Sequence, residues 1–416
     1  MNELENETIM RVGKGTPTGE LLRQYWIPAL RSARVEPGRS PVRFRVLGQS
    51  FVAWRGADGA LGIMDEACPH RGASMAQGIV EADCIRCIYH GWLFSADGHL
   101  LEAPTHPATA RLDKLPSGAR HCYEDGGMVW VWIGDGEPPA RPQFAFSGLG
   151  DDGIVHATGI VRANWVQMLE GLWDTFHAQI LHNRTNRQTF AGTQRLANYF
   201  SDKERPNSKM LYDFPDLSVE STEWGLRYQS SDEMKELNYA WIMPWYVHHT
   251  VSPDPMDDKA VQIHVPIDDD HTLFWQLMYN RNVPMKPDGF GRKTFGMFPD
   301  LNNFRSEYTP ENKWLQDRAA QEAGETFTGI ATGRGALTIL MEDIAIAEGQ
   351  GWLDRTDESL GATDIVVHRG RKALLDAVES FASGGPALGL AADVSDVEAV
   401  FNPKHVQPQQ APVTAG

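Results

Sequence analysis

Two short pairs of cysteine and histidine constrain the fold of this chain more than any other feature. Cys68 and His70 form the first pair, and Cys87 and His90 form the second after an interval of sixteen residues. Both pairs stand in glycine-containing loops, HRGAS and HGW, at the ends of predicted strands. Two loops of one sheet can bring four side chains to a common point, and two thiolates with two imidazoles form a metal-binding set. The chain is therefore expected to build a small β scaffold around these loops.

The order of the four residues leaves two kinds of metal centre open. One is a tetrahedral zinc site, although zinc fingers place cysteine close to cysteine and histidine close to histidine. The mixed pairs suit a two-iron cluster better, with both thiolates on one iron and both neutral imidazoles on the other. Cys84 forms a C-x-x-C with Cys87, but the strand-like sequence around it does not fit a redox dithiol. Cys84 and Cys122 are interpreted as core residues.

Strand and helix patterns predict two domains of different class. Residues 1–39 are a helical segment, and residues 40–137 form an all-β domain that contains both Cys–His pairs. Beyond a linker rich in Gly and Pro, residues 143–400 mix helices with strands. This mixture predicts an α+β domain in which helices flank one antiparallel sheet. The tail, 404–416, is poor in apolar residues and is expected to be disordered.

The elements expected within these domains follow from hydrophobic periodicity. The predicted strands are 42–47, 51–55, 61–64, 128–133, 224–230, 239–247, 261–265 and 273–279. The predicted helices are 16–26, 164–182, 336–349 and 368–382.

The composition of the chain excludes several classes of partner. A formal net charge of -17 disfavours nucleic acid and anionic membrane surfaces, because both are negatively charged. No apolar run approaches the roughly 20 residues that span a bilayer, so no membrane span is predicted. The acidic N-terminus shows no secretory signal, and four cysteines in 416 residues do not form a disulfide framework. The expected location is therefore the cytoplasm.

A second group of residues with metal-binding chemistry lies in the first predicted helix of the C-terminal domain. Asp174, His177 and His182 form the pattern D-x-x-H-x-x-x-x-H, and the helix must bend, end or bulge if both histidines are to meet one ion. Two histidines and one carboxylate leave coordination positions open, which suits a mononuclear Fe(II) that binds O₂ beside a substrate. The carboxylate can come from Asp174 or from elsewhere. Glu342 and Asp343 are candidates, because a carboxylate in an apolar helix should be paired or metal-bound.

Together these motifs resemble the Rieske non-haem iron oxygenases. CPHRG at 68–72 and CIYHGW at 87–92 match the two halves of the Rieske [2Fe–2S] motif, and D-x-x-H-x-x-x-x-H matches the iron-binding motif of that family. The opening GTPTGELLRQYW, VPIDDDHT at 265–272 and EGQGWLDRTDESLG at 348–361 are similar to the phthalate-dioxygenase branch. The resemblance covers roughly residues 5–380 and implies that the α+β domain has a helix-grip, START-like fold.

The resemblance implies a role for each residue of the two motifs. The implied ligands of the Rieske cluster are Cys68, His70, Cys87 and His90, and those of the mononuclear Fe(II) are His177, His182 and Asp343. Asp174 is then not a ligand. It is the bridge through which electrons reach this iron from the Rieske cluster of a neighbouring subunit.

The implied activity is that of a terminal oxygenase component, the alpha subunit of a multicomponent system. Such an enzyme uses O₂ to cis-dihydroxylate, monooxygenate or O- or N-dealkylate an aromatic substrate, and an aromatic carboxylate from hydrocarbon catabolism is favoured here. The chain has no nucleotide or flavin motif of its own, so electrons from NAD(P)H must arrive through a separate reductase. The resemblance implies a reductase of the FMN/[2Fe–2S] type. It also implies a homo-oligomer, either a trimer or stacked trimers.

The substrate pocket is less well marked than the metal sites. The residues proposed to line it are Trp173, Phe176, Trp241 and His249, although ordinary core packing explains the aromatic residues equally well. A substrate carboxylate favours an arginine partner, and Arg195, Arg205 and Arg227 lie in the right domain.

Two other functions stay open on the sequence alone. A Rieske-type electron carrier uses the first motif only, and this function gives the C-terminal domain no role. A zinc-binding structural protein uses the same side chains without redox chemistry.

Overall fold

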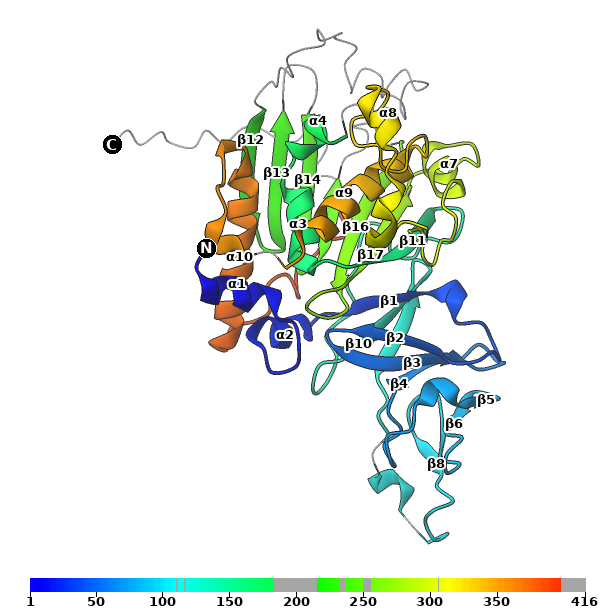
Figure 1. Cartoon of the computed structure of the whole chain (residues 1–416). Coiled ribbons are helices and arrows are strands. Elements are labelled where there is room, and N and C mark those ends of the chain that lie inside the picture. The colour runs from blue at the N-terminus through cyan, green and yellow to red at the C-terminus, as the bar shows by residue number, and fades with distance from the viewer. Residues whose placement is uncertain are drawn as a thin grey trace.

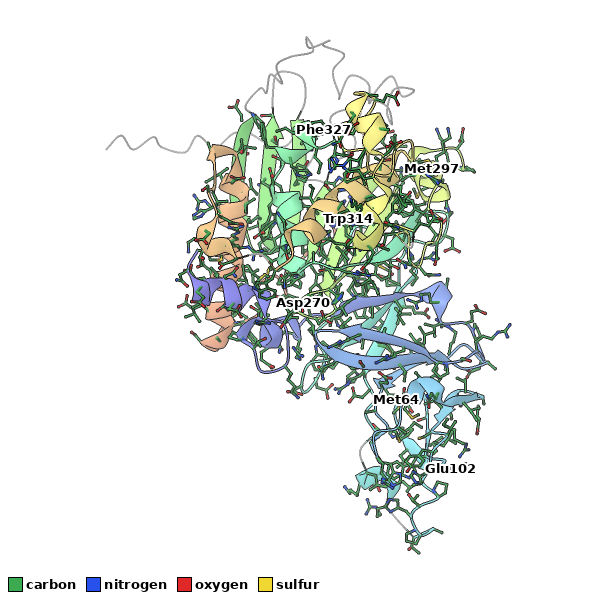
Figure 2. All side chains as sticks on the ribbon, viewed as in Figure 1. Met64, Glu102, Asp270, Met297, Trp314 and Phe327 are labelled. Atoms are coloured by element: carbon green, nitrogen blue, oxygen red, sulfur yellow. The ribbon has the colours of Figure 1, made fainter. Side chains whose placement is uncertain are left out.

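The computed structural model covers two parts of different architecture, a smaller β-rich part and a larger part in which helices lie on a sheet (Figure 1). Figure 2 marks the smaller part with Met64 and Glu102 and the larger part with Trp314 and Phe327. The residues described are 1–109, 111–115, 117–182, 215–231, 236–249, 256–305, 307–352 and 354–397. The tail at 404–416, predicted to be disordered, lies outside the described residues.

The N-terminal part consists of two short helices followed by small antiparallel sheets. The helices are α1 (Glu3–Met10) and α2 (Pro17–Leu22). The first sheet has the order β1 (Ile27–Arg31), β10 (Met128–Trp132) and β9 (His121–Asp125). The second has the order β2 (Val42–Val46), β3 (Gln49–Arg55) and β4 (Leu61–Asp65). The third has the order β5 (Ile79–Glu81), β6 (Cys84–Arg86), β7 (Leu93–Phe94) and β8 (Leu100–Glu102).

One antiparallel sheet of seven strands organises the described residues of the C-terminal part. Its order is β11 (Ile154–Val161), β17 (Thr272–Tyr279), β16 (Lys259–Pro266), β15 (Tyr246–His249), β14 (Glu236–Ile242), β13 (Gly225–Ser231) and β12 (Asp216–Thr222). The helices are α3 (Trp165–Trp173), α4 (His177–Ile180), α7 (Phe290–Gly296), α8 (Arg318–Glu322), α9 (Ala336–Gln350) and α10 (Ile365–Ala382). None of the described helices is long and apolar enough to cross a membrane.

The two faces of the seven-stranded sheet contact different layers, because successive side chains of a strand point to opposite sides. Trp275 points to the N-terminal part, where its indole N–H donates to the Pro28 carbonyl at 3.1 Å. Its neighbour Phe274 points to the other face and joins a hydrophobic cluster with Met168 of α3 and Met341 of α9. Helices α3 and α10 pack on this second face. The predicted fold class is confirmed, and the domain boundaries stay a prediction.

Among the local features that differ from the sequence analysis, three concern the elements around the two domains' main sheets and helices. The strand predicted over 239–247 is two strands, β14 and β15, because Pro244 has no N–H group with which to continue the ladder. The helix predicted over 164–182 is divided into α3 and α4. The N-terminal segment contains β1, which pairs with β10 and was not predicted, because its Pro28 interrupts the strand pattern.

The hairpin loop between β16 and β17 fixes the start of α3 to the N-terminal helices. Asp269 accepts a hydrogen bond from the N–H of Val12 at 2.9 Å, and its carbonyl accepts one from the side-chain amide of Asn164 at 2.7 Å. Asn164 is the N-cap of α3, and its amide also donates to the Met10 carbonyl at 3.0 Å. Asp270, labelled in Figure 2, marks this junction between the two parts.

Glu348 holds α9 in place through a buried ion pair, and its loss should destabilise the C-terminal domain. Its side chain is fully buried, pairs with Arg305 and accepts a hydrogen bond from the Trp314 indole at 2.7 Å. Glu348→Ala leaves the guanidinium of Arg305 buried without a countercharge, which costs about 3–5 kcal/mol. We expect a lower urea midpoint in circular dichroism. Glu311→Ala removes only an exposed pair and should change the midpoint little, so equal losses in both variants would contradict this account.

Candidate metal centres

The two Cys–His loops of the N-terminal domain share one hydrogen-bond pattern. The N–H groups of Cys68 and Cys87 each donate to the carbonyl five residues later, at 2.8 Å and 2.9 Å. Gly72 and Gly91, four residues after the cysteines, donate back to the cysteine carbonyls at 2.8 Å and 3.0 Å. Both glycines have a positive φ, 72° and 74°, a conformation that side chains disfavour. Two loops of the same geometry therefore follow β4 and β6, and each presents one cysteine and one histidine.

The thiols of this group face the interior and the imidazoles lie nearer the surface. Cys68 and Cys87 are buried, and burial together with the neighbouring Cys87 thiol raises the pKa of Cys68 to about 11. The rings of His70 and His90 are nearly perpendicular, with centroids 4.5 Å apart. Nδ1 of His90 is buried and has no hydrogen-bond partner in the part of the chain that the structure describes. Paired thiols, paired imidazoles and an unpaired ring nitrogen fit a centre with mixed sulfur and nitrogen ligands.

The other two cysteines lie apart from this group. The Cys84 thiol donates to the Asp83 carboxylate at 3.1 Å, and the Cys122 thiol lies 3.8 Å from the Leu61 carbonyl. Burial raises the pKa of both thiols to about 11, so neither is a thiolate at neutral pH. Cys84 is buried, which supports its interpretation as a core residue, whereas Cys122 is half-buried and packs against the core.

A second group of ligand side chains lies between α4 and α9. Candidate ligand atoms of His177, His182 and Asp343 are all within 4.8 Å of one another. Oδ1 of Asp343 is 2.8 Å from Nε2 of His182 and 3.3 Å from Nε2 of His177. Two imidazole nitrogens and one carboxylate that face a common point are the donor set that binds Fe(II) and leaves positions open. The residues present therefore fit a mononuclear iron.

A fully buried carboxylate behind the group orients His182. Oε2 of Glu342 lies 2.8 Å from Nδ1 of His182, and Oε1 accepts a hydrogen bond from the Thr328 hydroxyl at 2.6 Å. This contact directs Nε2 of His182 toward Asp343. Burial alone lowers the pKa of His182, but Asp343 and Glu342 raise it to about 10. Burial alone raises the pKa of Asp343, but the two imidazoles hold it well below its usual range.

Asp174 ends α3 and shapes the turn into α4. Its N–H donates to the Glu170 carbonyl at 2.8 Å, and its ψ of 88° then leaves the helical range. Oδ1 of Asp174 accepts hydrogen bonds from the N–H groups of Phe176 and His177, at 3.0 Å and 3.2 Å, and its carbonyl contacts Nδ1 of His177. The sequence required this helix to bend, end or bulge if both histidines were to meet one ion. The structure ends α4 at Ile180, between His177 and His182, and interrupts the predicted helix a second time at Asp174, before His177.

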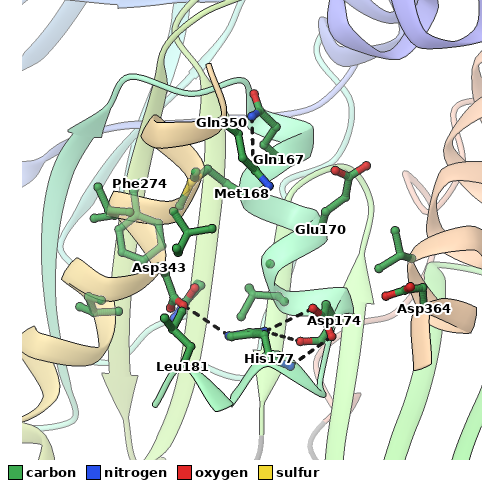
Figure 3. A pocket seen from close by; sticks show the side chains of 18 of the residues that line it. Gln167, Met168, Glu170, Asp174, His177, Leu181, Phe274, Asp343, Gln350 and Asp364 are labelled. Carbon is green, nitrogen blue, oxygen red and sulfur yellow. Dashed lines mark hydrogen bonds and ion pairs between the residues drawn. The ribbon is translucent and has the colours of Figure 1, made fainter. Parts of the chain in front are cut away.

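A cavity of about 270 Å³ lies beside this second group (Figure 3). Figure 3 shows His177 and Asp343 between Phe274 on one side and Asp174 on the other. An engineered cavity of about 150 Å³ binds benzene. A substituted aromatic ring therefore fits the volume beside His177 and Asp343, which both line the cavity. Other residues that line the cavity are Met168, Gln262, Leu340 and Ile344.

The structure separates the residues predicted to line the substrate pocket. Trp173 and Trp241 are fully buried with ring centroids 5.0 Å apart, in the core beneath α3, and neither lines the described cavity. Phe176 stands at the start of α4. Burial lowers the pKa of His249 to about 4, while the nearby charge of Asp343 opposes this, so His249 is a neutral imidazole close to the second group.

The arginines suggested for a substrate carboxylate receive little support from the structure. Arg227 pairs with Glu220 at 2.5 Å across β12 and β13. Arg195 and Arg205 lie outside the described residues. Gln262 and Phe274 line the cavity but were not predicted. The sequence of β16 could have indicated Gln262, because this polar side chain stands among the apolar residues of a predicted buried strand.

Comparison with known families accounts for both parts of the chain. Residues 25–116 match the Rieske [2Fe-2S] domain, and residues 131–410 match the family described as LigXa C-terminal domain like. An electron carrier needs only the first of these matches.

Two full-length relatives are similar to this chain. It is 30% identical over 424 residues to the 3-chlorobenzoate-3,4-dioxygenase oxygenase subunit of Comamonas testosteroni, with 96% of this chain and 93% of the relative covered. It is 32% identical over 402 residues to the phthalate 4,5-dioxygenase oxygenase subunit of Pseudomonas putida, with 92% and 88% covered.

Solved structures share the fold at lower identity. The terminal oxygenase of carbazole 1,9a-dioxygenase from Nocardioides aromaticivorans IC177 superposes with a TM-score of 0.57 at 19% identity, over 90% of this chain and 96% of that one. Dicamba monooxygenase bound to dicamba gives a TM-score of 0.56 at 17% identity, over 87% and 99%.

The family matches and the full-length relatives agree with the two groups of metal-binding side chains. Oxygenases of this family carry a Rieske [2Fe–2S] cluster and a mononuclear non-haem iron, and they take electrons from a separate reductase. The chain therefore belongs to the Rieske non-haem iron oxygenases, as a terminal oxygenase of the aromatic ring-hydroxylating kind.

Proposed function

We propose that this oxygenase acts on an aromatic carboxylate. The convergence of His177, His182 and Asp343 beside a cavity that accommodates an aromatic ring is the observation that carries the proposal. The names of the two full-length relatives, which refer to 3-chlorobenzoate and phthalate, support a carboxylate on the ring. Gln262 offers a side-chain amide in the lining of the cavity, where it can bind a polar substituent.

The proposed ligands follow from the two groups of side chains. The cluster ligands are Cys68, His70, Cys87 and His90, and the mononuclear iron ligands are His177, His182 and Asp343. When bound, the mononuclear iron supplies O₂ activation with electrons that the cluster delivers one at a time. The protein side chains hold and orient these groups. Glu342 fixes the imidazole of His182, and the backbone carbonyl of Asp174 orients that of His177.

Asp174 is proposed to carry electrons between subunits. The Cys–His loops belong to the N-terminal domain, at the opposite end of the molecule from α4 in Figure 1, so a cluster of a neighbouring copy is better placed to serve this iron. The carboxylate of Asp174 is 33% exposed at the wall of the cavity. Ile88 and Tyr89, which precede His90, are more than half exposed and offer an apolar surface for contact. A homotrimer or stacked trimers fit this arrangement.

The electron source is proposed to be an NAD(P)H-dependent reductase of the FMN/[2Fe–2S] type. The described residues form the two domains of the oxygenase, and neither domain contains a nucleotide-binding βαβ unit in these residues. A separate protein is therefore proposed to bind NAD(P)H.

A substrate screen tests the proposed function. The purified oxygenase is combined with a surrogate reductase and NADH, and O₂ uptake and products are measured for benzoates, phthalates, aryl ethers and N-methyl compounds. Uptake coupled to a hydroxylated aromatic acid supports the proposal, and product analysis distinguishes cis-diols from monooxygenated or dealkylated products. If O₂ uptake is coupled to product formation only with uncharged aromatic compounds, the assignment of a carboxylate substrate is wrong.

The ligand assignment predicts different results for neighbouring cysteines. Cys84→Ser should retain the visible absorption of the Rieske cluster, because its thiol bonds to Asp83 and lies outside the paired loops. Cys87→Ser should lose that absorption, because it removes one of the two thiolates. Spectra of the two purified variants provide the comparison. Bleaching in the Cys84 variant with a normal spectrum in the Cys87 variant would reverse the assignment.

Glu342→Gln should weaken binding of the mononuclear iron by about 10–100-fold, because His182 loses its orienting carboxylate. Fe(II) titration of the iron-depleted site measures the change, and the Rieske absorption should remain. Glu322→Gln, at an exposed acidic residue of α8, serves as the control. Unchanged iron affinity in the Glu342 variant would show that His182 is oriented by other contacts.

Asp174→Asn should retain the cluster and bind the mononuclear iron but lose most of its turnover, because the carboxylate bridge between subunits is removed. Metal analysis and product formation under saturating reductase measure the two properties. Near-normal product formation would count against the bridge.

A further inference from the structure

A buried cluster of charged side chains holds the end of α3 that precedes Asp174. Glu170 accepts hydrogen bonds from Arg355 at 2.8 Å and 2.9 Å and from Arg371 at 2.7 Å. Arg371 also binds Glu358, and Arg355 donates to the Asn6 side chain of α1 at 2.9 Å. Two guanidinium groups and two carboxylates therefore balance in charge. All four side chains are at most 20% exposed.

Stability alone is a weak explanation for this cluster. Replacing buried ion pairs with apolar residues of similar size is often neutral or stabilising, so such pairs tend to be kept for a specific geometry. Glu170, Glu358 and Arg371 line the same cavity as Asp174 and His177, which connects the cluster to the site. Both guanidinium groups bind Glu170, which lies one helical turn before Asp174.

Gly370, the residue before Arg371 in α10, contacts Trp173 in the last turn of α3. A Cβ atom at Gly370 would lie 2.6 Å from the indole ring of Trp173, so α10 approaches α3 at this point as closely as a glycine permits. Trp173 is confined on its other side by Trp241, at 5.0 Å between ring centroids. Consecutive residues of α10 thus fix Glu170 through charge and Trp173 through packing.

This last turn of α3 determines where Asp174 lies. The carbonyl of Glu170 accepts the N–H of Asp174 at 2.8 Å, and Trp173 directly precedes Asp174 in the chain. Oδ1 of Asp174 in turn accepts the N–H of His177. A shift of Glu170 or Trp173 would therefore move the proposed electron bridge, whereas His182 is held separately by Glu342 on α9.

We propose that Gly370 and Arg371 of α10 are positioning residues that hold Asp174 in the geometry needed for electron transfer from a neighbouring subunit. The proposal rests on the bridge role of Asp174 given above. Helix α10 supplies none of the proposed metal ligands. Under this proposal, it nevertheless controls the rate of electron delivery. Misplacement of a reacting group by about 1 Å can lower a rate 100-fold.

The test follows reoxidation of the pre-reduced Rieske cluster after the holoenzyme is mixed with O₂ and substrate. Gly370→Ala and Arg371→Gln should each slow this step by about tenfold or more. Iron content and the absorption of the oxidised cluster should stay near those of the unmodified enzyme, and substrate is kept saturating because Arg371 lines the cavity. Controls are Gly349→Ala, where the added Cβ meets nothing within 4 Å, and Arg369→Gln at an exposed position of α10.

Asp174→Asn, measured in parallel, separates the two levels of the proposal. Rapid reoxidation in Asp174→Asn overturns the bridge role itself. Slow reoxidation in Asp174→Asn with normal rates in Gly370→Ala and Arg371→Gln overturns only the positioning role. Slow rates explained by a matching loss of iron or of folded protein also overturn it. If Arg371→Gln does not fold, Arg371→Lys is measured in its place. Lysine keeps the positive charge but cannot donate to Glu170 and Glu358 with a guanidinium fork, so an intermediate rate is expected.

Discussion

The catalytic domain depends on one carboxylate oxygen that is held within reach of two imidazoles. Oδ1 of Asp343 lies 2.8 Å from His182, although the two residues are separated by 161 positions in the chain. No local propensity can maintain such a contact, so α4 and α9 must each be fixed by the surrounding structure. The seven-stranded sheet provides the common surface, with α3 and α9 packed in the hydrophobic cluster on the face that carries Phe274.

Buried charge fixes the helices more specifically than apolar contact can. Glu348 pairs with Arg305 near the C-terminal end of α9, and Glu170 pairs with Arg355 on α3. These ion pairs have defined geometry, whereas apolar packing alone tolerates small rotations and shifts. Asp343 projects from α9, and the turn after α3 presents Asp174 and His177. The geometry of the iron site therefore depends on side chains that do not touch the iron.

The sequence was informative where chemistry requires a fixed spacing. The Cys–His loops were predictable because each needs a glycine with positive φ four residues after its cysteine. The two histidines five positions apart required a break in the helix, although its exact place was not predictable. The structure ends α4 at Ile180, between the two histidines, and separates α4 from α3 at Asp174, whose side chain accepts two backbone hydrogen bonds. The strand predicted over 239–247 was wrong because an aromatic-rich pattern outweighed Pro244. The partners of Glu170 were not predictable, since they lie 185 and 201 residues away.

One chain of this oxygenase is expected to hold a two-iron cluster and a separate mononuclear iron. The decisive measurement is metal and acid-labile sulfide analysis of anaerobically purified protein, together with its visible spectrum. We expect about three irons and about two sulfides per chain and a Rieske spectrum. Zinc in place of iron, or a colourless protein without sulfide, would contradict this expectation.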